Sequence, residues 1–328
     1  MDTQKRKITV AFLSIVSNTT LTILKLVTGL FIGSVSIISE AIHSGVDLLA
    51  SLIAFAAVKT AGKPADRNHP FGHGKIENIS GAIEAVLIFV AAGWIIYEAV
   101  KKLIHPAHVE FLGWGVAIMF VSSIVNWLVS GRLFKVGRET ESIALQADAW
   151  HLRTDVYTSL GVMVGLAIMW VGKRAFPGTH LHWIDPVIAI AVALVIIRTA
   201  YDLTVESLRD LMDTNLPPEE EAYIRSLIES MTPEVHGYHK LRTRKAGSHR
   251  FIEFHMKVDP QMTVKESHRI THEIKRQVVE QFPHASLSIH VEPCDGCCSQ
   301  ECRERCLLTD DARRRIQKAR SKNTQHVS

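Results

Sequence analysis

The sequence predicts a membrane protein that combines an all-α bundle of six transmembrane helices with a smaller α+β domain. Three observations support this fold class. The mean hydropathy is positive, +0.12, although 21% of the residues are charged. The long apolar runs occupy the first two thirds of the 328 residues. The last third instead has short alternating stretches between amphipathic segments, which is typical of strands and helices in a soluble domain.

A transmembrane helix needs about 20 mostly apolar residues, and six segments of the sequence meet this requirement. They cover residues 8–33, 37–59, 76–104, 111–133, 142–171 and 183–203. The first apolar run continues to Phe31 and is too long for the core of a cleavable signal peptide. We therefore interpret it as the first membrane helix.

The distribution of Lys and Arg among the loops predicts the orientation of these helices. Short cytoplasmic loops carry more Lys and Arg than the loops on the opposite side of a membrane. Four such residues lie on one side, namely Lys101, Lys102, Lys173 and Arg174. Ten lie on the other side, namely Lys5, Arg6, Lys7, Lys59, Lys63, Arg67, Lys75, Arg132, Lys135 and Arg138. Because six spans return the chain to its starting side, we expect both termini in the cytoplasm.

The segment after the sixth helix predicts a cytoplasmic domain with the element order α-β-β-α-β. Residues 217–231 and 263–281 have helical character, and the first of these helices begins with two prolines and three glutamates, which suit a helix N-terminus. Residues 237–244, 250–258 and 286–292 are predicted to be strands. The expected fold is ferredoxin-like or metallochaperone-like.

The expected boundaries are residues 1–7 for the N-terminus, 8–206 for the transmembrane part, 207–293 for the α+β domain and 294–328 for a Cys-rich, basic tail. In the tail, residues 312–322 are interpreted as either a solvated helix or a disordered segment. The net charge of +4 is modest and the basic residues form no single stripe, which argues against nucleic-acid binding. We expect no enzyme, since the sequence lacks a P-loop, an HExxH motif and a nucleophile elbow.

Two predicted transmembrane helices carry the same pair of ionisable residues at the same spacing. His43 and Asp47 lie in the second helix, and His151 and Asp155 lie in the fifth. Residues i and i+4 share one helix face. An aspartate in hydrocarbon costs at least ~2.5 kcal/mol by insertion scales, so packing alone does not explain two such pairs. Together they offer two imidazoles and two carboxylates, which suit tetrahedral Zn²⁺.

Other polar residues in these helices have more than one interpretation. Glu40 and Asp148 are either proton-relay or entry residues or hydrogen-bond partners between helices, and the sequence favours neither interpretation. For four others we favour contacts between helices or snorkelling of the side chain toward the membrane surface, namely Asn18, Lys25, Glu84 and Asn126.

The loop between the second and third spans contains Asp66, His69 and His73, which are candidate metal ligands. Gly72 and Gly74 allow tight turns there. Taken alone, this segment is a polar loop with incidental histidines. Beside the two pairs of membrane ligands, we favour a metal site.

All cysteines lie in one short stretch, with the spacing C-x2-C-C-x3-C-x3-C. They are Cys294, Cys297, Cys298, Cys302 and Cys306. A helix would align the last three of these thiols. Thiols stay reduced in the cytoplasm and can bind Zn²⁺ or Cu⁺. We therefore favour an additional metal-binding module over a redox-active or incidental tail.

These features together resemble the cation diffusion facilitator family, in particular its bacterial zinc and ferrous-iron efflux branch. The resemblance covers residues 8–293 and includes the six spans, the two HxxxD pairs, the loop D-x-x-H-P-F-G-H-G-K and the stretches LRTRKAG and FIEFH. It implies a homodimer in the inner membrane of a bacterium that exports a divalent metal, with Zn²⁺ as the expected cargo, in exchange for protons.

The resemblance also implies roles for individual residues. It assigns the two HxxxD pairs to the transport site and the three loop ligands to a second site. It implies a salt bridge between Lys75 and Asp213 that locks the dimer. A metal pair that bridges the two cytoplasmic domains is implied at His239, His255, His268, His290 and Glu292, the last in place of an aspartate. His268 and His272 also share one helix face at i and i+4.

One departure from the branch affects the expected metal. Its members usually have Asp at the position of His43, and the form with two His/Asp pairs is similar to zinc-preferring members. Imidazole suits zinc, whereas carboxylate and water suit Mn or Mg. The alternatives to zinc are Fe²⁺, Cd²⁺, Co²⁺ and Mn²⁺. The alternative functions are a divalent-cation channel and a membrane-anchored metal sensor.

Overall fold

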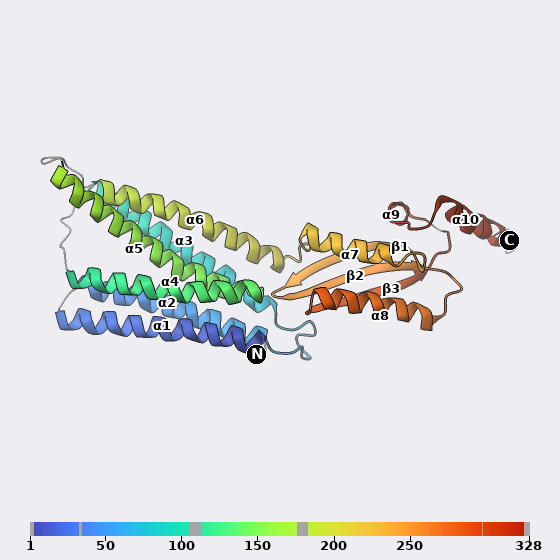
Figure 1. Cartoon of the computed structure of the whole chain (residues 1–328), viewed down its shortest axis with the longest axis horizontal. Coiled ribbons are helices and arrows are strands. Elements are labelled where there is room, and N and C mark those ends of the chain that lie inside the picture. Colours follow the sequence, from blue (N-terminus) through green and yellow to red (C-terminus); the bar gives the residue numbers. More distant parts are fainter. Residues whose placement is uncertain (1–2, 33–34, 105–112, 176–182, 297, 325–328) are drawn as a thin grey trace. The chain divides into compact units, whose positions relative to one another are not determined.

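The computed structural model describes residues 3–32, 35–104, 113–175, 183–296 and 298–324. It divides into two compact units, Met1–Leu211 and Met212–Ser328. Within the described residues, the first unit consists of long helices and the second contains a three-stranded sheet with helices (Figure 1). The predicted fold class is confirmed.

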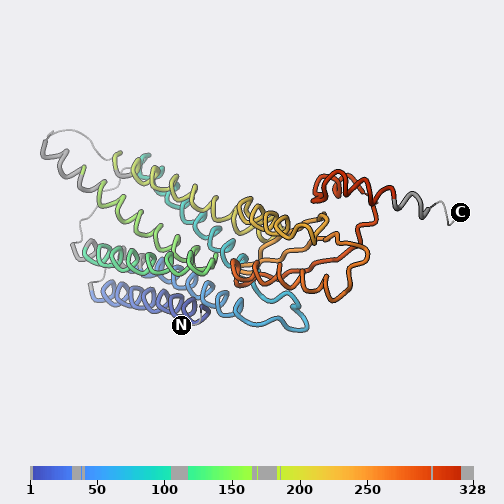
Figure 2. The backbone as a smooth tube through the Cα atoms, turned by 45° about the vertical axis from the view of Figure 1, so that its right-hand side comes forward, coloured from blue at the N-terminus to red at the C-terminus, as the bar shows by residue number. Residues whose placement is uncertain are grey.

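The six helices of the first unit run side by side in both Figure 1 and Figure 2. They are α1 (Thr3–Ile32), α2 (Val35–Ala61), α3 (Lys75–Ile104), α4 (Gly113–Glu139), α5 (Ile143–Ala175) and α6 (Ile184–Leu211). Several extend past the predicted apolar segments, as α6 does beyond residue 203. Hydropathy marks where a helix leaves the apolar region, whereas the backbone hydrogen bonds continue until a turn interrupts them.

Small residues allow the helices to approach one another closely. Ala85 and Ala92 of α3 and Ala200 of α6 are fully buried in one cluster. At Gly81 of α3, a Cβ atom would lie 2.7 Å from both the Ile143 and the Ser207 side chains. Small residues of this kind are typical of helix contacts in membrane proteins.

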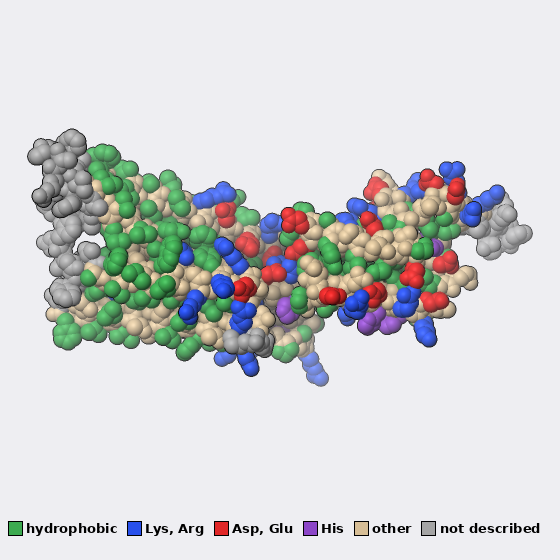
Figure 3. Space-filling model, viewed as in Figure 1, with side chains coloured by type: hydrophobic (Ala, Val, Ile, Leu, Met, Phe, Trp, Pro, Cys, Tyr) green, Lys and Arg blue, Asp and Glu red, His purple; other side chains and the backbone are tan. Residues whose placement is uncertain are grey.

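The exterior of the bundle is apolar. Phe12, Trp94 and Leu128 are among many large hydrophobic side chains exposed there, and hydrophobic side chains cover much of the bundle face seen in Figure 3. Judged over the described residues alone, α1, α2, α3, α4 and α6 are long and apolar enough to cross a membrane. The fifth helix, α5, has 33 residues and packs against α3, α4 and α6. The first unit is therefore a multi-pass membrane domain.

The second unit follows the predicted order. It contains α7 (Pro218–Ser230), β1 (Val235–Ala246), β2 (His249–Val258), α8 (Val264–Gln281) and β3 (Ala285–Pro293). The sheet order is β1-β2-β3, with β1 antiparallel and β3 parallel to β2. A capping box between Thr263 and Glu266 fixes the start of α8. The tail adds α9 (Gln300–Glu304) and α10 (Asp310–Thr324), so the helical interpretation of the basic end is confirmed.

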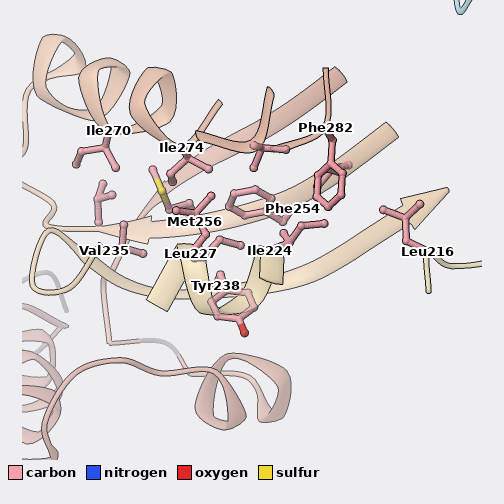
Figure 4. Packing of buried hydrophobic residues seen from close by; sticks show 14 residues of the cluster. Leu216, Ile224, Leu227, Val235, Tyr238, Phe254, Met256, Ile270, Ile274 and Phe282 are labelled. Atoms are coloured by element: carbon pink, nitrogen blue, oxygen red, sulfur yellow. The ribbon is translucent and has the colours of Figure 1, made fainter. Parts of the chain in front are cut away.

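The two larger helices share a core with one face of the sheet. Ile224 of α7 and Ile270 of α8 pack with Phe254 and Met256 of β2 (Figure 4). Successive residues of a strand point to opposite faces. His255 therefore lies on the face of the sheet that these helices do not cover, where polar side chains can gather.

The tail does not form the single helix that would align three of its thiols. The three thiols of Cys298, Cys302 and Cys306 do not lie on one helix, because α9 is only five residues long and ends at Glu304. Cys306 instead forms an isolated antiparallel bridge with Gly237 of β1. Backbone pairing with the edge of the sheet replaces the helical hydrogen bonds that the spacing suggested.

Candidate metal sites

The two HxxxD pairs of α2 and α5 meet inside the bundle. His151 Nε2 lies 3.1 Å from Asp47 Oδ1, and both residues are only 5% exposed. His43 Nε2 lies 4.0 Å from Asp155 Oδ1. Ligand atoms of His43, Asp47 and Asp155 all lie within 4.8 Å of one another. The structure thus places three of the predicted transport ligands, His43, Asp47 and Asp155, in one cluster, and His151 joins it through its contact with Asp47.

Neighbouring polar groups orient this site. Asn126 Nδ2 of α4 donates to Asp155 Oδ2 at 3.4 Å. The sequence interpretation treated Asn126 as a helix contact only, because spacing along α4 says nothing about which residue of α5 it faces. Outer hydrogen bonds of this kind orient metal ligands and tune their affinity.

Asp148 lies next to the site but is bonded elsewhere. It is fully buried, and its Oδ1 accepts a hydrogen bond from Ser51 Oγ at 3.0 Å. Ser51 also contacts Ser14 and Asn18 of α1. These contacts favour the interpretation of Asp148 as a hydrogen-bond partner between helices. The side chain of Glu40 lies outside the described residues.

A cavity of about 590 Å³ reaches the four ligands. Beyond them, it is lined by Trp94 of α3, Met119 of α4 and Val162 of α5. All three lie toward the ends of these helices that are far from residues 62–74. The cavity thus extends from the ligands toward that end of the bundle.

The loop ligands also converge. Asp66 Oδ1 lies 3.2 Å from His69 Nδ1, and Asp66 Oδ2 lies 3.4 Å from His73 Nε2. Gly72 supports this turn with a positive φ of 83° and donates its N–H to His69 O. The His69 N–H, donated to the Asp66 carboxylate, is the main reason why the pKa of Asp66 is lowered. An ionised carboxylate and two imidazoles could hold a metal ion here.

Three histidines of the second unit lie in one row across the sheet. His239 of β1 pairs with His255 of β2, which pairs with His290 of β3. A bulge after His239, where Lys240 has a φ of 53°, sets this register. Adjacent rings lie 5.0 and 4.7 Å apart. The row is therefore a product of strand register.

Glu292 joins this row through hydrogen bonds to two of the histidines. Its carboxylate lies 3.1 Å from His239 Nε2 and 2.6 Å from His255 Nδ1. Lys257 Nζ lies 2.6 Å from the same carboxylate. Burial raises the pKa of Glu292, but the hydrogen bonds from Lys257, His255 and His239 outweigh it and lower the pKa to about 2. His239, His255 and Glu292 could share a metal ion.

Other predicted residues lie apart from these clusters. The His268 ring on α8 stacks near His272, with 5.9 Å between centroids, and among the described residues it is not in the His239 cluster. Lys75 Nζ donates to Leu211 O at 3.3 Å, and Asp213 accepts from Arg244 at 3.3 Å. Because Lys75 and Asp213 belong to different units, their salt bridge stays a prediction.

Four of the five cysteines are described, and Cys297 lies outside the described residues. Cys294 and Cys302 are buried, whereas Cys298 and Cys306 are half-buried. All four occur in the segment that leaves β3 and returns to β1. A metal ion at these thiols stays a prediction.

Comparison with known proteins places this geometry in a family. Residues 11–212 match the cation efflux transmembrane domain, and residues 216–294 match the cytoplasmic domain of cation efflux proteins. An uncharacterised transporter of Synechocystis sp. is 37% identical over 261 residues, which cover 80% of this chain and 82% of the relative. The cation-efflux pump FieF of Escherichia coli is 30% identical over 274 residues, covering 84% and 88%.

Solved cytoplasmic domains are also similar. The zinc form of the zinc transporter CzrB is 37% identical, with a TM-score of 0.25, and covers 26% of this chain and 97% of that one. The metal-bound C-terminal domain of the CzcD transporter from Thermotoga maritima is 33% identical, with a TM-score of 0.22, and covers 23% and 87%. The two family-model matches together span both units, and the chain therefore belongs to the cation efflux, or cation diffusion facilitator, family of membrane transporters.

Proposed function

We propose that this protein exports Zn²⁺ from the cytoplasm in exchange for protons, as a homodimer in the plasma membrane of a bacterium with both termini in the cytoplasm. The observation that carries the proposal is the convergence of His43, Asp47, His151 and Asp155 at a cavity inside a membrane bundle. Ionisable groups at such a position mark an ion pathway. Membership of the cation efflux family supports efflux as the direction of transport.

The ligand set favours zinc among the divalent metals. Two imidazoles and two carboxylates suit tetrahedral Zn²⁺, whereas Mn²⁺ prefers a set made mainly of oxygen ligands. Fe²⁺, Cd²⁺ and Co²⁺ are the alternatives that a transport assay would distinguish.

The site also explains how protons would expel the metal. Zinc binding requires neutral imidazoles and ionised carboxylates. His151 Nε2 is hydrogen-bonded to Asp47 Oδ1, so a proton shared between these two atoms and a zinc ion would occupy the same lone pairs. Imidazole has an ordinary pKa of about 6.5 and changes its protonation near neutral pH. Metal and protons therefore compete for the same atoms, which couples efflux of one to uptake of the other.

Access to the site alternates, we infer, between the two sides of the membrane. The cavity extends from the ligands away from residues 62–74. At the opposite end, Lys7 of α1 bonds to Glu77 of α3 at 3.1 Å, and Ser142 donates to the same glutamate. With the termini in the cytoplasm, this conformation is open to the outside. Breaking the buried contacts would open the cytoplasmic end.

The test is zinc uptake into proteoliposomes that contain a zinc-sensitive dye and carry an imposed pH gradient. Wild type is compared with Asp47→Ala. We expect zinc flux that depends on the gradient and disappears in the variant. Flux that persists without the gradient would favour a channel. Folded wild-type protein that moves another metal but no zinc would overturn the choice of substrate alone.

A further inference from the structure

The segment after β3 forms a loop on the second unit, and backbone hydrogen bonds tie both ends of this loop to the sheet. Cys294 begins it, and its N–H donates to Val258 O of β2 at 2.8 Å. The loop ends where Leu307 N donates to His236 O at 3.0 Å and Cys306 pairs with Gly237. A Cβ at Gly237 would lie 2.9 Å from Arg305 O. Glycine thus permits residues 305–307 to add a short strand to the free edge of β1.

The four described thiols, Cys294, Cys298, Cys302 and Cys306, all belong to this loop, and we name them the thiol cluster. Ser299 caps α9 by accepting a hydrogen bond from Cys302 N, which fixes the buried Cys302. Gln317 Nε2 of α10 lies 3.8 Å from Cys298 Sγ. Cys302 therefore lies on α9, Cys294, Cys298 and Cys306 lie in the loop around it, and α10 reaches the cluster through Gln317.

The thiols of the cluster interact electrostatically. Burial, followed by the neighbouring thiols of Cys298 and Cys294, raises the pKa of Cys302 to about 11. Burial also raises the pKa of Cys294, and Cys298 and Cys306 contribute to the increase. Each thiolate disfavours the next because like charges repel. A bound cation would remove this repulsion, and metal binding to such a group would release protons.

We propose that the thiol cluster is a metal site for Zn²⁺ or a comparably soft cation, separate from the proposed transport site. Three or four thiolates around one ion form a common structural zinc site. The site would fasten the tail to the edge of β1. A cavity of about 760 Å³ is lined both by Cys302 of the cluster and by His239 of the histidine row.

The loop must contract when the ion binds. Among the described cysteines, no three sulfur atoms lie within 4.8 Å of one another. Zinc–sulfur bonds of about 2.3 Å place tetrahedral sulfur ligands roughly 3.8 Å apart. The site is therefore expected to close around the metal, and the exposed Arg303 and Arg305 should become less accessible to trypsin.

The experiment is a Co²⁺ titration of the full-length protein in detergent, reduced and without oxygen, followed by displacement with Zn²⁺. Cobalt bound by thiolates gives a sulfur-to-metal charge-transfer absorption that His and Asp ligands do not give. We expect one such ion per chain, with the thiols protected from alkylation. In Cys302→Ser and in the half-buried Cys298→Ser, affinity should fall by more than the ~10–100-fold typical of outer-shell changes.

The matched control is His255→Ala, which removes a ligand of the histidine row and should leave the thiolate absorption unchanged. The proposal would be overturned if the absorption is absent, if it survives both serine variants, or if the thiols remain reactive at saturating Zn²⁺. It would also be overturned if the reduced thiols only form disulfides on oxidation and bind no metal. None of these results depends on zinc flux, so failure of the transport proposal is detected separately.

Discussion

At the residue scale, the sequence predicts that the ligands of α2 and α5 converge, and in the structure His151 lies beside Asp47 while His43 lies 4.0 Å from Asp155. Residues at i and i+4 share one helix face. When each of two helices carries such a pair, a single contact between these faces is enough to bring the side chains together. The row of His239, His255 and His290 could not be predicted from spacing in the same way. It depends on strand register and on the bulge after His239, which depend on contacts between strands.

Replacing Asn126 by Ala should weaken zinc binding at the proposed transport site by about 10–100-fold, because Asp155 loses a donor that orients it. The measurement is the zinc affinity of the purified variant, which is compared with the affinities of wild type and of Asp155→Ala. Asn18→Ala is the matched control, since Asn18 donates to Ser51 and touches none of the four ligands. Equal affinities of wild type and Asn126→Ala would contradict an orienting role.

Replacing Lys257 by Met should tighten metal binding at the histidine row about tenfold. The ammonium of Lys257 lies 2.6 Å from the Glu292 carboxylate and competes with a metal ion for it. An ion pair near a protein surface can supply the roughly 1.4 kcal/mol that a tenfold change needs. Calorimetric titration with zinc measures the change, and Lys265→Met on the exposed start of α8 serves as control. Weaker binding in Lys257→Met would show that the lysine supports the site.

Acid should remove the contribution of Glu292 to stability in a defined range. The folded-state pKa is about 2 and the ordinary value is 4.5. A lowered carboxylate pKa stabilises the fold above the ordinary value, and the stabilisation disappears as pH falls through the folded-state value. The stability difference between wild type and Glu292→Gln should therefore be full at pH 5 and above and shrink toward pH 2. A constant difference across thermal unfolding curves at these pH values would contradict the assignment.

At the scale of elements, the sequence predicted the type of a helix or strand where a single hydrophobic period runs through the segment. The strands β2 and β3 fall within a residue or so of their predicted ranges, whereas several membrane helices, such as α4 and α6, extend beyond theirs. The tail was harder to predict, because the spacing of its cysteines matches a helix while its backbone pairs with β1. With five residues, α9 is too short to show a helical hydrophobic period in the sequence. The structure of the tail after α9 depends on its contact with β1, which is distant in the sequence.

Replacing Gly81 by Ala should destabilise the helical unit by about 1–3 kcal/mol, the usual cost of overpacking. The added Cβ would meet the buried Ile143 and Ser207 side chains at 2.7 Å. Thermal unfolding in detergent measures the effect. Gly93→Ala in the same helix is the control, because nothing lies within 4 Å of its Cβ position. It should be neutral or slightly stabilising, and equal destabilisation by both variants would refute the packing argument.

At the scale of the whole molecule, the candidate metal sites are distributed over both units. The membrane unit carries the buried ligands and the cavity, and the second unit carries a histidine row and a thiol cluster of its own. Metal on the second unit can bias transport only if the two states of the transporter bind it with different affinity. The sequence predicted which candidate metal ligands belong to the membrane helices and which belong to the domain that follows them. It could not predict how the units respond to each other, because that depends on a dimer of two chains.

The most direct test of the central claim measures proton movement driven by zinc alone. Proteoliposomes with a pH dye inside, no imposed pH gradient and the membrane potential clamped receive external Zn²⁺. Because metal and protons are proposed to compete for His151 and Asp47, inward zinc flux should make the lumen alkaline. His151→Ala should abolish this change. Zinc that enters without any change in luminal pH would contradict proton-coupled exchange.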